Sequence, residues 1–172
     1  MHHFYFSLTV KINSGAFLFL YYVIIQGNKP MSDLFLKIIS REIPSHIIYE
    51  NETTLAFLAL HPNTKGHTLV IPKNYSRNML DISESDLLEV MKTVRLIAPQ
   101  IIKAVGAEGF CIGQNNEAVA GQAVFHTHFH IIPRFADDGL VHWHGHDVSQ
   151  ETLAEIAEII KLGIKYYTRI TS

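Results

Sequence analysis

The hydrophobic and polar positions of this chain repeat with two different periods. Apolar residues recur at helical spacing in three segments, 32–43, 83–106 and 149–167. Short runs rich in β-branched and aromatic residues lie outside these segments, at 46–51, 53–60, 67–73, 109–116 and 123–135. Because tight turns separate many of these runs, the pattern predicts an α+β fold with a five-stranded antiparallel sheet and a long helix between strands.

The longest predicted helix has clear sequence signals at its ends. Ser83 stands three residues before Asp86, a spacing typical of an N-terminal cap, and Gly106 follows the last apolar position. Pro99 is expected to bend the helix. The expected buried face consists of Leu87, Met91, Val94, Ile101 and Val105.

The chain has 172 residues, which is enough for one domain with a hydrophobic core. We expect residues 1–30 to be an N-terminal extension, 31–148 to form the domain, and 149–172 to form a C-terminal helix. The apolar run 16–25 is shorter than the roughly 20 residues that cross a bilayer, so no membrane partner is expected.

Charge and cysteine content narrow the functional classes. With 14 basic and 16 acidic side chains, the net charge is -2, so general nucleic-acid binding is not expected. Cys111 is the single cysteine and cannot form an internal disulfide, which fits a reducing compartment and predicts a cytoplasmic location.

Two runs of alternating histidines stand close together in the sequence. In the first, His126, His128 and His130 alternate with Phe125, Thr127, Phe129 and Ile131, a pattern that predicts a strand with its imidazoles on one face. In the second, His142, His144 and His146 alternate with Val141, Trp143 and Gly145, which offer no consistent apolar face. We therefore expect the second run to be a loop, in which solvent exposure or adventitious metal binding is favoured over catalysis.

Three aligned imidazoles are compatible with more than one kind of site. Neutral imidazole is a nucleophile and proton carrier near neutral pH, and it is equally a zinc ligand. Just upstream, Gly121 and Gln122 form a turn whose bare backbone N–H groups could face a phosphate, with Asn115 as a further polar ligand. A phosphate site beside a nucleophilic histidine suggests phosphoryl or nucleotidyl transfer.

The segments "KIISREIPSHIIYEN", "HPNTKGHTLVIPKN", "NNEAVAGQAVFHTHFHIIPR" and "DDGLVHW" resemble the histidine triad nucleotide-binding family, in the family's order. The resemblance implies a homodimer with joined sheets, a purine nucleotide substrate, and no required cofactor or catalytic metal. It implies that His128 attacks the α-phosphate and carries the nucleotide covalently, assisted by His126, His130 and the upstream His67. It further implies phosphate and leaving-group contacts from Asn115, Gly121, Gln122 and Ala123, and a base pocket walled by Ile43 and Phe57.

This chain also departs from the family pattern. Ala59 stands where the family usually clasps the ribose with Asp or Asn, and His61 or Asn63 could replace that contact. Ala123 replaces a common Ser or Thr, and Asp33 and Leu36 replace a zinc-binding CxxC pair, so a structural zinc is not expected.

The resemblance predicts a nucleotide phosphoramidase or nucleotidyl hydrolase that acts on P–N or P–O–P bonds. A dinucleoside polyphosphate hydrolase is the alternative enzyme, and it would need cations such as Lys65, Lys73 or Arg134 for the longer phosphate chain. A nucleotide-binding or metal-binding module with little turnover is the alternative outside enzymes.

Overall fold

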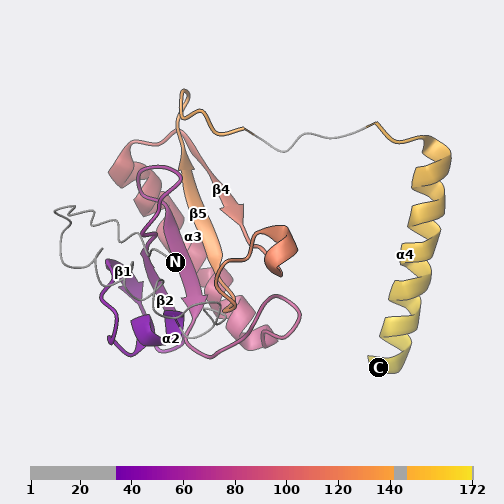
Figure 1. Ribbon diagram of the computed structural model, residues 1–172, viewed down its shortest axis with the longest axis horizontal. Helices are drawn as coiled ribbons and strands as arrows, with labels where there is room; N and C mark the ends of the chain where they lie inside the picture. Colours follow the sequence, from indigo (N-terminus) through magenta and orange to yellow (C-terminus); the bar gives the residue numbers. More distant parts are fainter. Residues whose placement is uncertain (1–33, 142–146, 172) are drawn as a thin grey trace, which may run out of the picture. The chain divides into compact units, whose positions relative to one another are not determined.

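The computed structural model describes residues 34–141 and 147–171, with side chains as far as residue 164. The chain separates into two compact units, with the boundary between Asp138 and Gly139. The first unit contains the sheet and the helices that pack on it (Figure 1). The second contains one long helix. The predicted N-terminal extension and the second histidine run, His142, His144 and His146, lie outside the described residues.

The first unit is built on a five-stranded antiparallel sheet with the strand order β1-β2-β3-β5-β4. The strands are β1 (Ile47–Glu50), β2 (Thr54–Leu58), β3 (Thr68–Pro72), β4 (Gly109–Gly113) and β5 (Phe129–Arg134). The predicted α+β fold with a long helix between strands is therefore confirmed. The last strand was predicted to begin at residue 123, which is wrong, because β5 begins only at Phe129.

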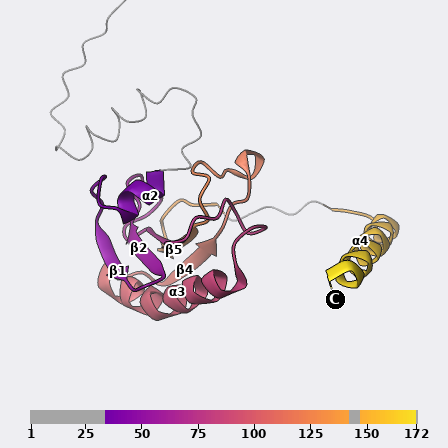
Figure 2. The same cartoon turned by 90° about the horizontal axis from the view of Figure 1, so that it is seen from below.

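Two helices cover opposite faces of this sheet, as Figure 2 shows. α3 (Glu84–Val105) packs on the side chains of Ala56, Val70, Phe129 and Ile131. α2 (Leu34–Ile39) packs on the other face, against Leu55, Phe57, Leu69, Ile71 and Val124. Successive residues of a strand point to opposite faces, which explains why neighbours on β2 and β3 belong to different clusters.

The predicted ends of the longest helix are confirmed. The Ser83 hydroxyl accepts a hydrogen bond of 3.1 Å from the Asp86 backbone N–H, and Gly106 closes α3 with a left-handed φ of 72°. α3 continues through Pro99 to Val105, and the expected bend at this proline stays a prediction.

One position of the predicted buried face of α3 is wrong. Met91 is 38% exposed, whereas the buried residues are Val90, Thr93, Val94, Ile97, Ala98 and Ile101. The predicted Val94 and Ile101 do lie in the buried stripe, whereas Val90 takes the place expected for Met91. Periodicity locates a stripe, but packing against the sheet selects which residue lies at its centre.

The second unit contains α4 (Gln150–Thr171), which confirms the predicted C-terminal helix. Its first turn is capped by the Ser149 hydroxyl, which accepts a hydrogen bond of 3.2 Å from the Thr152 backbone N–H. Among the helices of the described ranges, none combines the length and the hydrophobicity that crossing a membrane would require.

Candidate active site

Four histidines meet on the face of the sheet that α2 covers. The ring centroids of His128 and His130 are 4.9 Å apart, and those of His67 and His130 are 5.1 Å apart. Phe35 of α2 lies 5.2 Å from the ring of His128 and 5.9 Å from that of His126. The three alternating histidines therefore share one side, as the sequence predicts, although only His130 belongs to β5.

Hydrogen bonds determine which nitrogen of His67 and His130 carries a proton. The Asn63 backbone N–H donates to Nδ1 of His67 over 3.1 Å, so the proton of a neutral His67 ring is on Nε2. That Nε2–H donates to Nδ1 of His130 over 2.9 Å. The proton of a neutral His130 ring is therefore on its own Nε2, which leaves this ring one further donor.

The same reasoning assigns the tautomers of His128 and His126. Nδ1 of His128 lies 2.6 Å from the backbone carbonyl oxygen of His126, which can only accept, so this nitrogen donates. Nε2 of His126 likewise donates to the carbonyl oxygen of Pro72 over 2.9 Å. A neutral His128 ring thus keeps an unprotonated Nε2 whose lone pair is available for attack.

Burial keeps these imidazoles neutral. His126, His128 and His67 are buried, and burial lowers the pKa of each below its ordinary value. The pKa of His130 falls from 6.5 to about 3, first because of burial and then because its protonated ring would be repelled by protonated forms of His128 and His67. All four rings are therefore neutral near pH 7, which is the form in which histidine acts as a nucleophile.

Hydrogen bonds between Thr127 and Ser76 hold the segment that carries His126 and His128. Between them, the Thr127 backbone N–H donates to the Ser76 carbonyl oxygen over 2.7 Å, and the Ser76 hydroxyl donates to the Thr127 hydroxyl over 2.8 Å. Phe129 and Ile131 pack in the α3-side core, as the sequence predicts. The role of Ser76 was not predicted, and the one available signal was the lone polar Thr127 among apolar alternate positions.

The loop before these histidines differs from the prediction. The Gly121 backbone N–H donates to the Ala118 carbonyl oxygen over 3.0 Å, and the Gln122 N–H donates to the Glu117 carbonyl oxygen over 3.1 Å. The expectation of bare N–H groups at Gly121 and Gln122 is therefore wrong. The reason is local, because residues Ala118–Ala120 form a turn of 3₁₀ helix, η2, and the carbonyls of Ala118 and of the preceding Glu117 accept from these two donors.

The predicted phosphate contacts Gln122, Asn115 and Ala123 differ in how exposed they are. The Gln122 side chain is only 2% exposed and donates to the carbonyl oxygens of Arg77 and Val124. Asn115 is half-buried, and its amide donates to the Gly121 carbonyl oxygen over 3.4 Å. Ala123 is exposed, and its N–H donates no hydrogen bond within the described part of the chain. Ala123 therefore keeps a bare N–H beside the segment that carries the histidines.

The two residues predicted to wall the base pocket lie together beside α2. Phe57 is buried with its ring 5.5 Å from that of Phe35, and Ile43 packs against the same cluster. Ala59, at the position of the ribose clasp, also packs there, and its N–H donates to the His67 carbonyl oxygen over 2.9 Å. Phe35 links this apolar wall to the histidines, a role that its helical spacing did not reveal.

Two of the three cations considered for a polyphosphate chain already have carboxylate partners. Lys73 pairs with Glu50 at 2.8 Å, and Arg134 pairs with Asp138 at 2.6 Å and also lies 3.7 Å from the sulfur of half-buried Cys111. Within the ranges that the structure describes, no group of three or more His, Cys, Asp or Glu side chains is arranged to hold a metal ion.

The sequence and the structure were compared with known proteins, and the matches below point to the same family. The HIT domain matches residues 40–137, more than half of the chain. An uncharacterized HIT-like protein of Mesomycoplasma hyorhinis is 51% identical over 108 residues, which is 63% of this chain and 97% of that protein.

Two further matches cover more of the chain. The adenosine 5'-monophosphoramidase of Schizosaccharomyces pombe is 37% identical over 137 residues, which is 78% of this chain and all of that protein. A crystal structure from Streptococcus mutans shares 41% identity with a TM-score of 0.73, over 80% of this chain and 88% of that one. With its histidines gathered on one face of a five-stranded sheet, this chain belongs to the HIT family.

Proposed function

We propose that this protein is a nucleotide phosphoramidase that works through a covalent nucleotidyl-histidine intermediate. The observation that carries the proposal is the tautomer of His128, whose Nδ1–H is held by the His126 carbonyl oxygen at 2.6 Å. This bond leaves the Nε2 lone pair free, and burial keeps the ring neutral. A nucleotide hydrolase is supported at a coarser level by a relative that is an adenosine 5'-monophosphoramidase.

The proposed reaction has two displacement steps. The Nε2 lone pair of His128 attacks the α-phosphorus, an N–P bond forms, and the bond to the leaving nitrogen breaks as that nitrogen takes up a proton from water. A second water then attacks the phosphorus and releases the nucleoside monophosphate, which returns His128 to its neutral form. We assign the remaining donor of His130, its Nε2–H, to a phosphate oxygen in both steps.

Substrate binding is assigned to the residues around this center. Ile43, Phe57 and Phe35 supply an apolar surface for the base, because they form one packed group next to His126 and His128. Asn115 and the Ala123 N–H are assigned to the phosphate and the leaving group, whereas Gly121 and Gln122 shape the loop that carries them.

A homodimer in the cytoplasm, without a required cofactor, is the proposed working state. β4 is an outer strand of the sheet, and its Phe110 and Ile112 are 45% and 44% exposed. An open strand edge with exposed apolar side chains is suited to pairing with another strand. We assign the partner to the β4 of a second copy, and Ile112→Lys should reduce the molar mass in sedimentation equilibrium to that of a monomer.

The alternative of a dinucleoside polyphosphate hydrolase is less well supported. It would use the same His128 but needs cations for the additional phosphates, and Lys73 and Arg134 are already paired with carboxylates. The third possibility, a binding module with little turnover, is motivated by Ala59 and Ala123, which lack the polar side chains common at these positions.

One experiment separates the three functions. The purified protein is incubated with adenosine phosphoramidate and, separately, with diadenosine tetraphosphate, and AMP release is followed by chromatography. The proposal predicts rapid AMP release from the phosphoramidate and slow release from the tetraphosphate. Faster release from the tetraphosphate would favour the alternative enzyme, and no release from either would favour the binding module.

A further inference from the structure

Glu117 has an unusual backbone conformation. Its φ is 70° and its ψ is 159°, a backbone conformation that residues other than glycine rarely adopt. It stands immediately before η2, in the loop that begins at Asn115 and ends at Ala123. Such a conformation persists only where the surroundings hold it, and it is found most often at functional sites. The contacts of Glu117 therefore reveal what shapes this loop.

Three donors from one segment hold the Glu117 carboxylate. The Arg77 guanidinium donates through Nε over 2.7 Å and through Nη2 over 2.6 Å, one bond to each carboxylate oxygen. The Asn78 side-chain amide adds a third bond of 2.7 Å. The same guanidinium lies 4.2 Å from the centroid of the Phe125 ring. This two-pronged geometry is specific to arginine, because a lysine ammonium cannot form both parallel bonds.

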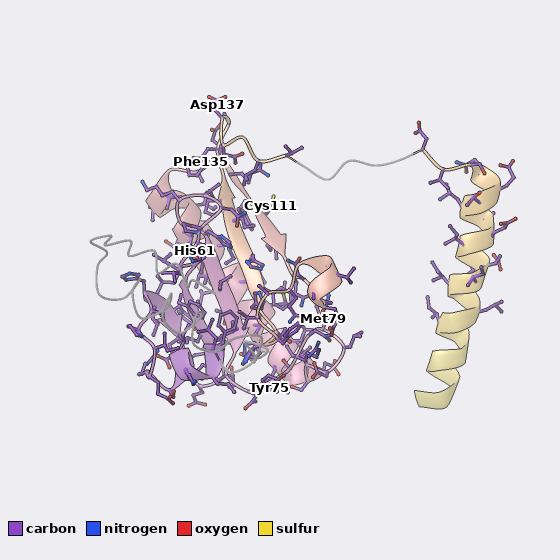
Figure 3. All side chains as sticks on the ribbon, viewed as in Figure 1. His61, Tyr75, Met79, Cys111, Phe135 and Asp137 are labelled. Atoms are coloured by element: carbon purple, nitrogen blue, oxygen red, sulfur yellow. The ribbon has the colours of Figure 1, made fainter. Side chains whose placement is uncertain are left out.

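The backbone of the loop is tied to the same segment. The Glu117 N–H donates to the Gln122 side-chain oxygen over 2.8 Å, and the Gln122 amide donates to the Arg77 carbonyl oxygen over 2.6 Å. The Met79 N–H donates to the Asn116 side-chain oxygen over 2.9 Å. Figure 3 shows Met79 and Tyr75 at the end of the sheet where η2 lies, away from Phe135 and Asp137 at the other end.

This segment also holds the nucleophile. Ser76 is bonded to Thr127, which stands between His126 and His128. Its neighbour Arg77 forms a hydrogen-bonded ion pair with Glu117 in the 115–123 loop. Two adjacent residues therefore fix the two parts of the proposed site, so their positions relative to one another depend on residues 76–79.

We propose that Arg77 and Glu117 are positioning residues that hold the 115–123 loop at the distance from His128 that phosphate binding requires. The assignment rests on the proposed function, because it takes Asn115 and the Ala123 N–H as phosphate contacts. Glycine would adopt the backbone conformation of residue 117 without strain. What glutamate adds at this position is its carboxylate, whose partners come from residues 77 and 78.

Arg77→Ala is the first test variant, and its binding of AMP is compared with its binding of adenosine by calorimetry. Adenosine lacks the phosphate, so its affinity should be unchanged, whereas the affinity for AMP should fall by at least about tenfold. Arg77→Lys should restore the AMP affinity only in part. Lys92→Ala is the matched control, because it removes an exposed ion pair with Glu89 on α3 and should change neither affinity.

Glu117→Gly and Glu117→Gln provide variants that remove the ion pair from the other side. Glu117→Gly removes the backbone strain but adds backbone freedom, whereas Glu117→Gln keeps the backbone preferences of a side-chain-bearing residue, so a loss of AMP affinity in both variants is attributed to the missing carboxylate. Equal AMP affinity in wild type, Arg77→Ala and Glu117→Gly would overturn the proposal. A parallel loss of adenosine and AMP affinity would also overturn it, because the defect would then be general.

Hydrogen exchange separates this proposal from the proposed function. In Arg77→Ala and in Glu117→Gln, the amides of 115–123 should exchange faster than in wild type, while those of β2 and β3 should not change. This result is expected whether or not the protein cleaves phosphoramidates. Unchanged exchange in the loop would overturn the positioning role, whereas an absence of AMP release from wild type would overturn only the proposed function.

Discussion

Acid should destabilise the folded protein through His130 in particular. Its pKa is about 3 in the folded protein, against an ordinary value of 6.5, because the ring is largely buried and faces His128 and His67. Well above pH 6.5, His130 is neutral in both the folded and the unfolded chain. As the pH falls through 6.5, the unfolded chain binds a proton that the folded chain excludes, so the free energy of unfolding decreases progressively until about pH 3.

The size of this effect follows from the difference between the two pKa values. One pKa unit corresponds to about 1.4 kcal/mol, so His130 alone should lower the free energy of unfolding by about 3 kcal/mol between about pH 7.5 and pH 4.5. Such a loss is a large fraction of the stability of an ordinary domain.

Urea unfolding followed by circular dichroism measures this loss. His130→Gln removes the titrating group while keeping an amide that can bond to His67, so its stability should fall by about 3 kcal/mol less than that of wild type over the same pH range. His46→Gln, which changes an exposed histidine, should behave like wild type. Equal losses in wild type and His130→Gln would refute the reasoning.

Three further changes test the site. His128→Ala should lower AMP release from adenosine phosphoramidate by at least about a thousandfold while calorimetry shows AMP binding largely retained, and turnover near the wild-type rate would exclude His128 as the nucleophile. Ala59→Asp should tighten binding of AMP relative to its 2′-deoxy analogue by about 1.5 to 3 kcal/mol in titrations; a strong ribose preference already present in wild type and lost in His61→Ala or Asn63→Ala would contradict this. Simultaneous replacement of His142, His144 and His146 by Ala should leave phosphoramidate hydrolysis within about tenfold in steady-state assays, and a collapse of activity would mean that the second histidine run takes part.

The sequence predicts best the strands whose alternate residues are buried in hydrophobic clusters on the two faces of the sheet. In β2 and β3, alternate residues such as Leu55 and Ala56 are buried against different helices, and their β-rich runs are bounded by polar turns. The start of β5 is different. Residues 123–128 are as β-rich as a strand, but Thr127 bonds to the loop residue Ser76 instead of to a neighbouring strand. Composition does not distinguish these two kinds of partner.

The candidate site was predictable where one local pattern defines it. The alternating histidines indicate their shared face, because a period of two requires it. The use of the Gly121 and Gln122 N–H groups was not predictable, since it depends on the turn formed at η2. The bond from the Gln122 side chain to the Arg77 carbonyl oxygen was not predictable either, because Arg77 is far away in the sequence. Phe35 likewise has the spacing of a core residue, and periodicity predicts that it is buried without showing that it is buried against His126 and His128.

The central claim is that the nucleotide is carried on Nε2 of His128. Wild-type protein is mixed with adenosine phosphoramidate, quenched within milliseconds, and digested for mass spectrometry. The account predicts an adenylyl group on the peptide that contains residues 126–130, located at His128 by fragmentation and absent from His128→Ala. Rapid AMP release without any adduct in wild type, or an undiminished adduct in His128→Ala, would contradict the account.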